Sequence, residues 1–530
     1  MPVVLDGKEV VDQMNVRRDA SASGEVLRWD QMLDEDDMAS DSATKIPTQQ
    51  SVKAYVDARQ YYGLTWDEDA DSYARTGMLA GIAAGSSPGD AALPIHARMR
   101  RCIISDAGEV QYYLNSNDST KKVDGSAADL TGADGQVMVE IPCFWYRYSY
   151  SGTTHRWDIS EFPLPGFTRH PAFVKNGANV DFRYIGAYEG VLYDTSESEY
   201  MNGLYLPSSA SYKMTFTNVD DKIQSDTLTH PFTNLEVGVD KVVVSGTVNN
   251  NGTYDVVTQG DDFITIGAGG TLTDEASVAC VIQTQRDWTA TTGDVLGSVS
   301  GKAPMTYGTR ANFRAVAANR GTGWRQLDFY LASAIQLLYL VEYADFYSQS
   351  MIGNGLTDWT AGWPAWNNYN PIETTGNSNG DGDVTANTSG GDATAGSYMS
   401  YRGIENWFGH IWQWVDGFNI NSNVPYFSNT DTDFADDTTA NYDDPGIELA
   451  SSNEYQNTLE QIDEGFLPAS VGNPGTATTK ITDYYYQNSG WRVARLGGHA
   501  SHGAFAGGFY WGLHYASSYL NRTIGGRVSY

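Results

Sequence analysis

The sequence predicts an α+β fold in which short strands dominate and one long helix packs across a sheet. Three observations support this prediction. The 530 residues include 34 Tyr, 14 Trp and 55 Gly, a composition typical of many short strands joined by ordered loops. Turn-forming residues separate β-branched and aromatic runs along most of the chain. Only one segment, which begins near Trp324, has a convincing helical period.

The charge balance excludes one class of partner. Asp and Glu number 65 against 33 Lys and Arg, so the formal charge is 33 − 65 = −32, and such a surface repels the phosphates of nucleic acid. The most apolar segment, 331–341, contains Gln336 and is much shorter than a membrane span. We therefore expect no nucleic-acid partner and no membrane insertion.

Residues 1–60 differ from the rest of the chain. The run DEDDMASDSATK is small and polar, and a short helix is expected to begin at Pro47. Its apolar stripe of Val52, Tyr55 and Val56 is too short to fold alone. We expect this helical segment to attach the chain to other proteins and to associate with further copies of itself. The alternative is a frayed N-terminal tail.

The remainder divides into three parts that differ in the length and spacing of their strand-like runs. Residues 61–211 and 290–530 carry strand-like runs with long loops, and we interpret them as two parts of one domain. Between them, 212–289 has alternating strands every 8–12 residues, with a turn over Asn250, Asn251 and Gly252 that suits a hairpin. This middle segment is predicted to be an inserted small β-sandwich, similar to an immunoglobulin domain.

The predicted long helix follows Trp324. Its apolar residues are spaced four, three, four and three apart, which places them on one helix face: Leu327, Leu331, Ala334, Leu338 and Val341. We expect this single face to pack across a sheet.

Catalytic motifs are weak, and we expect no enzymatic activity. Residues 85–89, GSSPG, match G-x-S-x-G, but the flanking residues LAGIAA and DAALP favour a turn over a nucleophile elbow. Gly301, Lys302 and Ala303 lack the hydroxyl that a P-loop uses to hold magnesium.

One loop has part of a calcium pattern. Its oxygen-bearing side chains are spaced like the first half of a calcium loop: Asn377, Asn379, Asp381 and Asp383. Thr388, however, stands where a bidentate Glu should complete the site. Calcium is therefore a weak candidate, and no other cofactor is expected.

The last forty residues are the main candidate for a binding surface. Rings and imidazoles alternate there with glycines, as in GAFAGGFYWGLHYASSY, and such residues supply rigid contact area in binding loops. A zinc site is less favoured because neither a carboxylate nor a thiolate accompanies the histidines. We expect about half of these rings, including Phe509, to belong to the core.

Three blocks of the chain resemble a known family. WRQLDFYLASAIQLLYLVEYADFYSQSMIGNG, YRGIENWFGHIWQWVDG and the segment from WRVARLGGHASHG to the last residue resemble the C-type-lectin-like domain of phage tail-fibre receptor-binding proteins. That group includes the major tropism determinant and other variable proteins of diversity-generating retroelements. It is related in fold to formylglycine-generating enzymes, whose catalytic thiols have no counterpart after Cys280.

The resemblance implies a C-type-lectin-like α+β domain whose termini pair as strands and whose long loops face the ligand. It implies a structural frame at 496–498, 503, 506–507 and 524–528. Between these positions the family places its receptor-contacting side chains, which correspond here to His499, Ser501, His502, Phe505, Trp511, His514, Tyr515 and Tyr519.

The function implied by the resemblance is non-covalent recognition of a host-cell surface receptor, either a glycan or an outer-membrane protein. The protein would be a homotrimer in the phage tail tip or fibre, attached to other tail proteins through residues 1–60. Two alternatives stay open: a tailspike-type depolymerase that cleaves polysaccharide with paired carboxylates, and a structural decoration of the virion.

Overall fold

The computed structural model describes residues 60–195, 198–201, 213–227, 232, 235, 237, 241–267, 271–284, 293–358, 373–388, 397–521 and 523–530, with 32–33, 46–47 and 52 near the N-terminus. The predicted attachment segment, 1–60, therefore lies almost entirely outside the described residues, and its role stays a prediction. Pro47, where a short helix is expected to begin, belongs instead to the strand Ile46–Pro47, whereas Val52 is helical.

The predicted α+β class with a C-type-lectin-like domain is wrong, because the fold is rich in β-structure. Strands account for 40% of the described residues and helices for 12%. Parts of the segments expected to be long loops form short strands instead, such as Ala386–Asn387, Met399–Tyr401 and Val424–Phe427. The described α-helices are α3 (Arg310–Ala318), α4 (Phe329–Tyr343) and α5 (Ser348–Ile352).

A seven-stranded antiparallel sheet contains the C-terminal strand. Its order is β25 (Arg325–Gln326), β37 (Val528–Ser529), β14 (Phe182–Gly186), β8 (Gln136–Pro142), β5 (Arg100–Ile104), β6 (Val110–Asn115) and β7 (Asp118–Lys122). Every residue of β8 is buried, as expected for a central strand that is covered on both faces.

A five-stranded antiparallel sheet holds the first strand after residue 60. Its order is β11 (Thr168–Arg169), β9 (Trp145–Ser151), β10 (Thr154–Ser160), β3 (Tyr61–Asp67) and β4 (Ser72–Gly77). Because β3 pairs with β4 and β10 whereas β37 pairs with β14 and β25, the first and last strands of 61–530 lie in different sheets. The expectation that they pair is wrong.

The third large sheet gathers the second half of the chain. Its order is β30 (Val424–Phe427), β29 (Trp412–Asn421), β34 (Trp491–Leu496), β35 (Trp511–Tyr515), β33 (Ile481–Gln487), β31 (Glu454–Leu459) and β32 (Pro468–Val471), and β36 (Ile524–Gly525) also pairs with β29. Two pairings are parallel, β33 with β35 and β29 with β36.

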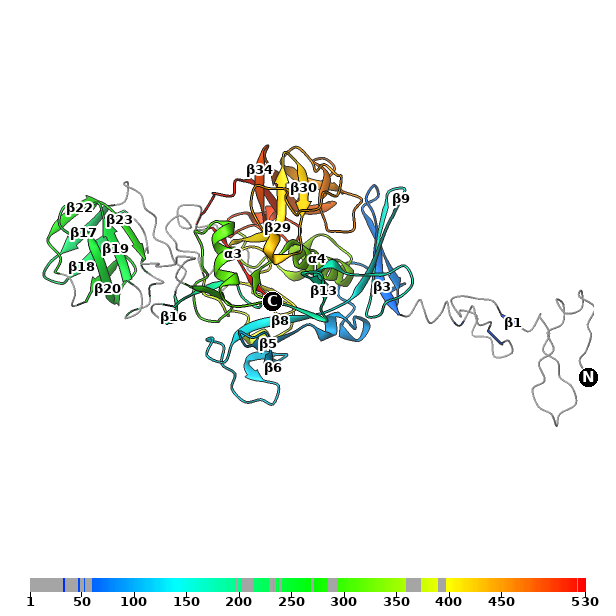
Figure 1. The fold of residues 1–530 in the computed structure, drawn as a ribbon, viewed down its shortest axis with the longest axis horizontal. Helices are drawn as coiled ribbons and strands as arrows, with labels where there is room; N and C mark the ends of the chain where they lie inside the picture. Colours follow the sequence, from blue (N-terminus) through cyan, green and yellow to red (C-terminus); the bar gives the residue numbers. More distant parts are fainter. Residues whose placement is uncertain are drawn as a thin grey trace, which may run out of the picture.

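The predicted insertion forms a sheet of its own, drawn on the left of Figure 1. Its order is β22 (Glu275–Ala279), β17 (Lys213–Thr217), β18 (Lys222–Ser225), β21 (Phe263–Ile266), β20 (Gly252–Gln259), β19 (Lys241–Ser245) and β23 (Val281–Thr284). Among the described residues its strands pair only with one another, and β20 joins two groups of strands because one part of it pairs with β19 and another part with β21. The predicted hairpin is confirmed, because β19 and β20 pair on either side of Asn250.

Shorter elements connect these sheets. The small strands are β1 (Met32–Leu33), β2 (Ile46–Pro47), β12 (Val174–Lys175), β13 (Ala178–Asn179), β15 (Val191–Asp194), β16 (Glu199–Met201), β24 (Val295–Gly297), β26 (Ala386–Asn387), β27 (Met399–Tyr401) and β28 (Ile404–Glu405). The 3-10 turns are η2 (Asp90–Ala92), η3 (His96–Arg98), η4 (Pro171–Phe173), η5 (Asn379–Asp381), η6 (Asp431–Asp433) and η7 (Gly503–Phe505).

Helix α4 lies at the centre of the main body (Figure 1) and contacts β29, β3, β10 and η4. It begins after Asp328, whose carboxylate accepts a hydrogen bond from the Leu331 amide at 3.0 Å, and it ends at Ala344, which has a left-handed backbone. All fifteen of its residues are buried. The helix therefore packs against sheets as expected, but its polar side is buried as well, because sheets and loops surround it on every side.

Candidate recognition face

The third large sheet, which has eight strands with β36 included, carries three consecutive tyrosines in its strand β33. In β33, Tyr485 is buried whereas Tyr484 and Tyr486 are half-buried, because successive side chains of a strand point to opposite faces. The parallel neighbour β35 places Trp511 beside Tyr485 and Gly512 beside Tyr486. One face of these strands therefore packs into the core, and the other carries exposed ring edges.

Seven half-buried rings form a continuous row across the exposed side, which we call the aromatic face. In order along the row, the rings are Tyr455, Phe505, Tyr484, Tyr486, His514, Tyr515 and Tyr519, and the six successive centroid distances are 5.5, 4.3, 4.6, 5.0, 4.2 and 3.7 Å. Three of these separations lie within the usual range of aromatic contacts and three are shorter. The row is held together by its own packing and needs no ligand to order it.

A buried arginine supports one end of the aromatic face. The Arg495 guanidinium lies 3.6 Å from the Trp412 ring centroid and 4.0 Å from that of Tyr515, and Nη2 is 3.1 Å from His514 Nε2. Gly512 makes this possible, since a Cβ atom there would lie 2.9 Å from Arg495 Nε. The guanidinium thus stacks on two rings and fixes their planes.

Two imidazoles at this site are uncharged at neutral pH. Burial, followed by the charge of Arg495, lowers the pKa of His502 to about 3, and the same two causes lower the pKa of His514 to about 3. Each ring therefore has one nitrogen that donates and one that accepts a hydrogen bond. His514 Nε2 accepts its hydrogen bond from Arg495 within the protein, so these neutral imidazoles are part of the packing of the aromatic face and add no charge to it.

The structure brings together most of the site residues that the family resemblance suggests. His502, Phe505, His514, Tyr515 and Tyr519 are half-buried on the aromatic face or beside it, and Ser501 is half-buried next to His502.

Two residues of the predicted set are corrected. Trp511 is fully buried on the opposite side of β35, where its indole donates a hydrogen bond to the Phe466 carbonyl at 2.9 Å. His499 is only 3% exposed and packs edge-on against Trp412. Neither side chain is accessible to a receptor. Trp511 lies in the core beside Tyr485, and the Trp412 ring covers His499. Phe509, predicted to belong to the core, is fully buried.

Sequence reasoning missed three members of the aromatic face: Tyr455, Tyr484 and Tyr486. The signal for two of them was present, because ITDYYYQ is a strand-like run in which alternate tyrosines must face one side. What the sequence could not show is that this strand lies parallel to β35, beside the C-terminal rings.

The predicted structural frame is buried except at Gly503, which is half-buried. Leu496, Ala506, Ile524 and Val528 are fully buried. At Gly507 an added Cβ would lie 2.0 Å from Asp483 Oδ1, so only glycine lets this loop approach β33. Asp483 Oδ2 in turn accepts a hydrogen bond from the Phe509 amide at 2.7 Å. The buried carboxyl of Asp483 thereby fixes the loop that carries Phe505.

Asp483→Asn should remove a pH dependence of stability. Burial raises the pKa of Asp483 well above its usual range, whereas in the unfolded chain an Asp ionises near about 3.9. The folded protein therefore holds a proton that the unfolded chain releases, and stability falls as the pH rises above that value. Denaturation midpoints measured across the pH range should change less with pH in the variant than in the wild type. Asp181→Asn, at an exposed carboxylate, should leave the wild-type slope, and an equal slope in both variants would contradict this account.

The weak calcium candidate has its side chains engaged by different protein groups. Asn379 and Asp381 accept hydrogen bonds from the hydroxyls of Tyr188 and Tyr398. Asp383 Oδ1 accepts one from the Arg101 amide, and Asn377 donates to the Thr374 carbonyl. Among the described residues, no group of three or more His, Cys, Asp or Glu side chains is arranged to hold a metal ion.

Comparison with protein-family models and with curated proteins gives no match. In the part of the chain that the structure describes, no helix has the length and apolar character required to cross a membrane.

Proposed function

We propose that this chain is a phage tail-fibre receptor-binding protein that recognises a host-cell surface molecule non-covalently through its aromatic face. The observation that carries the proposal is the continuous row of seven half-buried rings in contact with one another. Rings that are already packed lose little conformational freedom on binding, and they offer flat faces to sugar rings or to apolar protein loops.

The charge of the protein favours short-range recognition. With a formal charge of −32 the chain has no long-range attraction to an anionic bacterial envelope. Selectivity then depends on short-range contacts at the aromatic face, such as stacking against its rings. A trimeric fibre attached through residues 1–60 would present three such faces, and simultaneous binding would raise avidity without new contacts.

The decisive experiment measures binding of the labelled full-length chain to whole cells of candidate hosts. We expect saturable binding to a host strain and its loss in mutants that lack a single surface glycan or outer-membrane protein. The same incubation is assayed for new reducing ends. Saturable binding without reducing ends supports recognition, whereas reducing ends would identify a depolymerase. An absence of binding to every strain would leave a structural role in the virion.

A further inference from the structure

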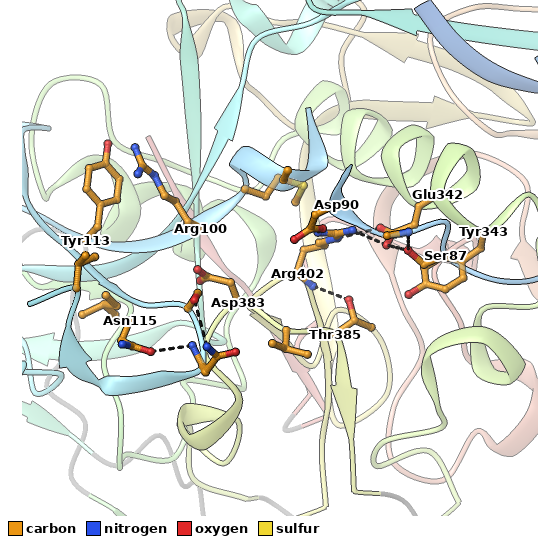
Figure 2. A pocket seen from close by; sticks show the side chains of 18 residues that line it. Ser87, Asp90, Arg100, Tyr113, Asn115, Glu342, Tyr343, Asp383, Thr385 and Arg402 are labelled. Atoms are coloured by element: carbon orange, nitrogen blue, oxygen red, sulfur yellow. Dashed lines mark hydrogen bonds and ion pairs between the residues drawn. The ribbon is translucent and has the colours of Figure 1, made fainter. Parts of the chain in front are cut away.

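A second concave site lies on another side of the main body. It has a volume of about 710 Å³, within the roughly 300–1,000 Å³ range of small-molecule sites. Its walls come from the β5–β6 hairpin, the η2 loop, the end of α4 and the loop before β26, and Figure 2 shows their side chains facing one another. In Figure 1, β6 and β34 lie at opposite sides of the body, so this pocket is separate from the aromatic face.

The walls of the pocket are fixed by buried hydrogen bonds. The Asp383 amide donates to the Ser116 carbonyl at 2.9 Å, and the Arg101 guanidinium donates to Ser119 at 2.9 Å and to Ser378 at 2.6 Å. The loop before β26 is therefore tied to the hairpin that faces it. A pocket held in this way needs little rearrangement to accept a ligand.

The cations of the pocket are already neutralised. Arg402 forms ion pairs with Glu342 at 2.6 Å and with Asp90 at 2.5 Å. Arg100 pairs with Glu140 at 3.4 Å and lies over the Tyr113 ring. Among the described residues that line the pocket, both arginines already have carboxylate partners, so the pocket does not favour a phosphate or carboxylate ligand.

Asp383 lines the pocket, and burial outweighs the attraction that Arg101, Arg100 and Arg402 exert on its carboxylate. Its Oδ1 accepts a hydrogen bond from the Arg101 amide at 2.6 Å, and burial raises its pKa to about 7. Near neutral pH this carboxyl therefore exists partly as a neutral acid, which both donates and accepts hydrogen bonds. It suits hydroxyl groups.

The rest of the lining mixes polar and apolar groups in similar amounts. Amides and hydroxyls of Asn115, Asn117 and Thr385 stand beside the apolar side chains of Met99 and Val384. A sugar has the same mixture, with hydroxyls around its edge and C–H groups on its faces. We propose that this pocket binds a neutral saccharide, as a second ligand site in addition to the aromatic face.

Val384 allows the proposal to be tested without disturbing the core. This side chain lines the pocket and is 48% exposed, so Val384→Trp places an indole in the pocket. Val257, 46% exposed in the inserted sheet, gives the matched control Val257→Trp. Val384→Ser removes the valine but leaves the pocket open.

The measurement is saturation-transfer NMR of the full-length chain with glucose, galactose, N-acetylglucosamine and their disaccharides. We expect at least one sugar to bind to the wild type, to Val257→Trp and to Val384→Ser, and to bind at least about tenfold more weakly to Val384→Trp. Melting curves check that each variant is folded. The proposal is overturned if no sugar of the panel binds, or if a folded Val384→Trp variant binds as the wild type does. Binding to host cells is recorded in parallel and should be unchanged in Val384→Trp, which separates this site from the proposed receptor site.

Discussion

Replacing Tyr484 and Tyr486 together with alanine should weaken binding of the full-length chain to receptor-bearing cells by about 100-fold, since central aromatic anchors each contribute about 2 kcal/mol and such effects are not strictly additive. These two rings lie in the middle of the aromatic face, 4.3 Å from Phe505 on one side and 5.0 Å from His514 on the other. Their loss divides the row in two and leaves a gap at its centre. The measurement is cell binding as a function of protein concentration.

A matched control distinguishes this effect from a general loss of aromatic surface. Phe162 is 53% exposed and belongs to no part of the aromatic face, so Phe162→Ala should bind cells as the wild type does. Because Tyr485 between the two tyrosines is fully buried, it is kept unchanged to preserve the fold. If the double variant melts normally and still binds cells fully, the aromatic face is not the receptor site.

Asp328→Ala should lower the free energy of unfolding by about 3–5 kcal/mol, the usual effect of removing one partner of a buried ion pair. Asp328 Oδ2 lies 2.6 Å from Arg183 Nη2 and 3.1 Å from Arg325 Nε, and all three side chains are nearly or fully inaccessible to water. The substitution leaves two guanidiniums buried without this carboxylate. It also removes the hydrogen bond that caps α4 at the Leu331 amide. Chemical denaturation followed by tryptophan fluorescence measures the effect.

Two comparisons separate the contributions of Asp328. Asp328→Asn keeps an oxygen for the Leu331 amide and should differ from Asp328→Ala by about 1 kcal/mol, the usual contribution of a helix cap. Arg98→Ala removes an exposed ion pair with Glu161 and should cost less than about 1 kcal/mol. If Asp328→Ala is as mild as Arg98→Ala, the buried cluster does not stabilise the fold as described.

The same carboxylate sets the sign of an acid effect. Burial opposes ionisation of Asp328, but Arg183 and Arg325 overcome this and hold its pKa well below the usual range. Its stabilising contribution is therefore complete above the unfolded-state pKa of about 3.9 and is lost as the pH falls through the folded value. The stability contributed by Asp328 is thus lost on acidification, whereas the stability contributed by Asp483 is lost as the pH rises. The Asp328→Ala variant should lack the loss on acidification.

Helix α4 shows how far periodicity can be trusted. The spacing of Leu331, Ala334, Leu338 and Val341 correctly identifies a helix and its buried residues. It cannot reveal that the opposite side is buried as well, because that depends on distant partners. Gln336 donates to the Gly508 carbonyl, and Glu342 pairs with Arg402. From the sequence alone, a polar residue is expected to face solvent. Only the fold shows that a distant partner allows it to be buried.

The C-terminal rings show the same limit. Local composition correctly marks the last forty residues as a dense aromatic cluster, and it anticipates that part of the cluster is core. Which ring faces outward depends on the register of β35 against β33 and β34, and a shift of one residue would exchange the two faces. The family resemblance places Trp511 among the receptor-contacting residues, whereas the structure buries it.

The sequence alone determined properties that depend on composition and on neighbouring residues: the net charge of −32, the long helix, the hairpin at Asn250 and the aromatic-rich C-terminus. Only the tertiary structure decided that the fold is β-rich, that the tyrosines of β33 join the C-terminal rings, and that a pocket forms between β6 and the loop before β26. The physical reason is that strand pairing and burial bring together residues that are far apart in the chain. The partner of a strand therefore cannot be recognised from the residues next to it in sequence.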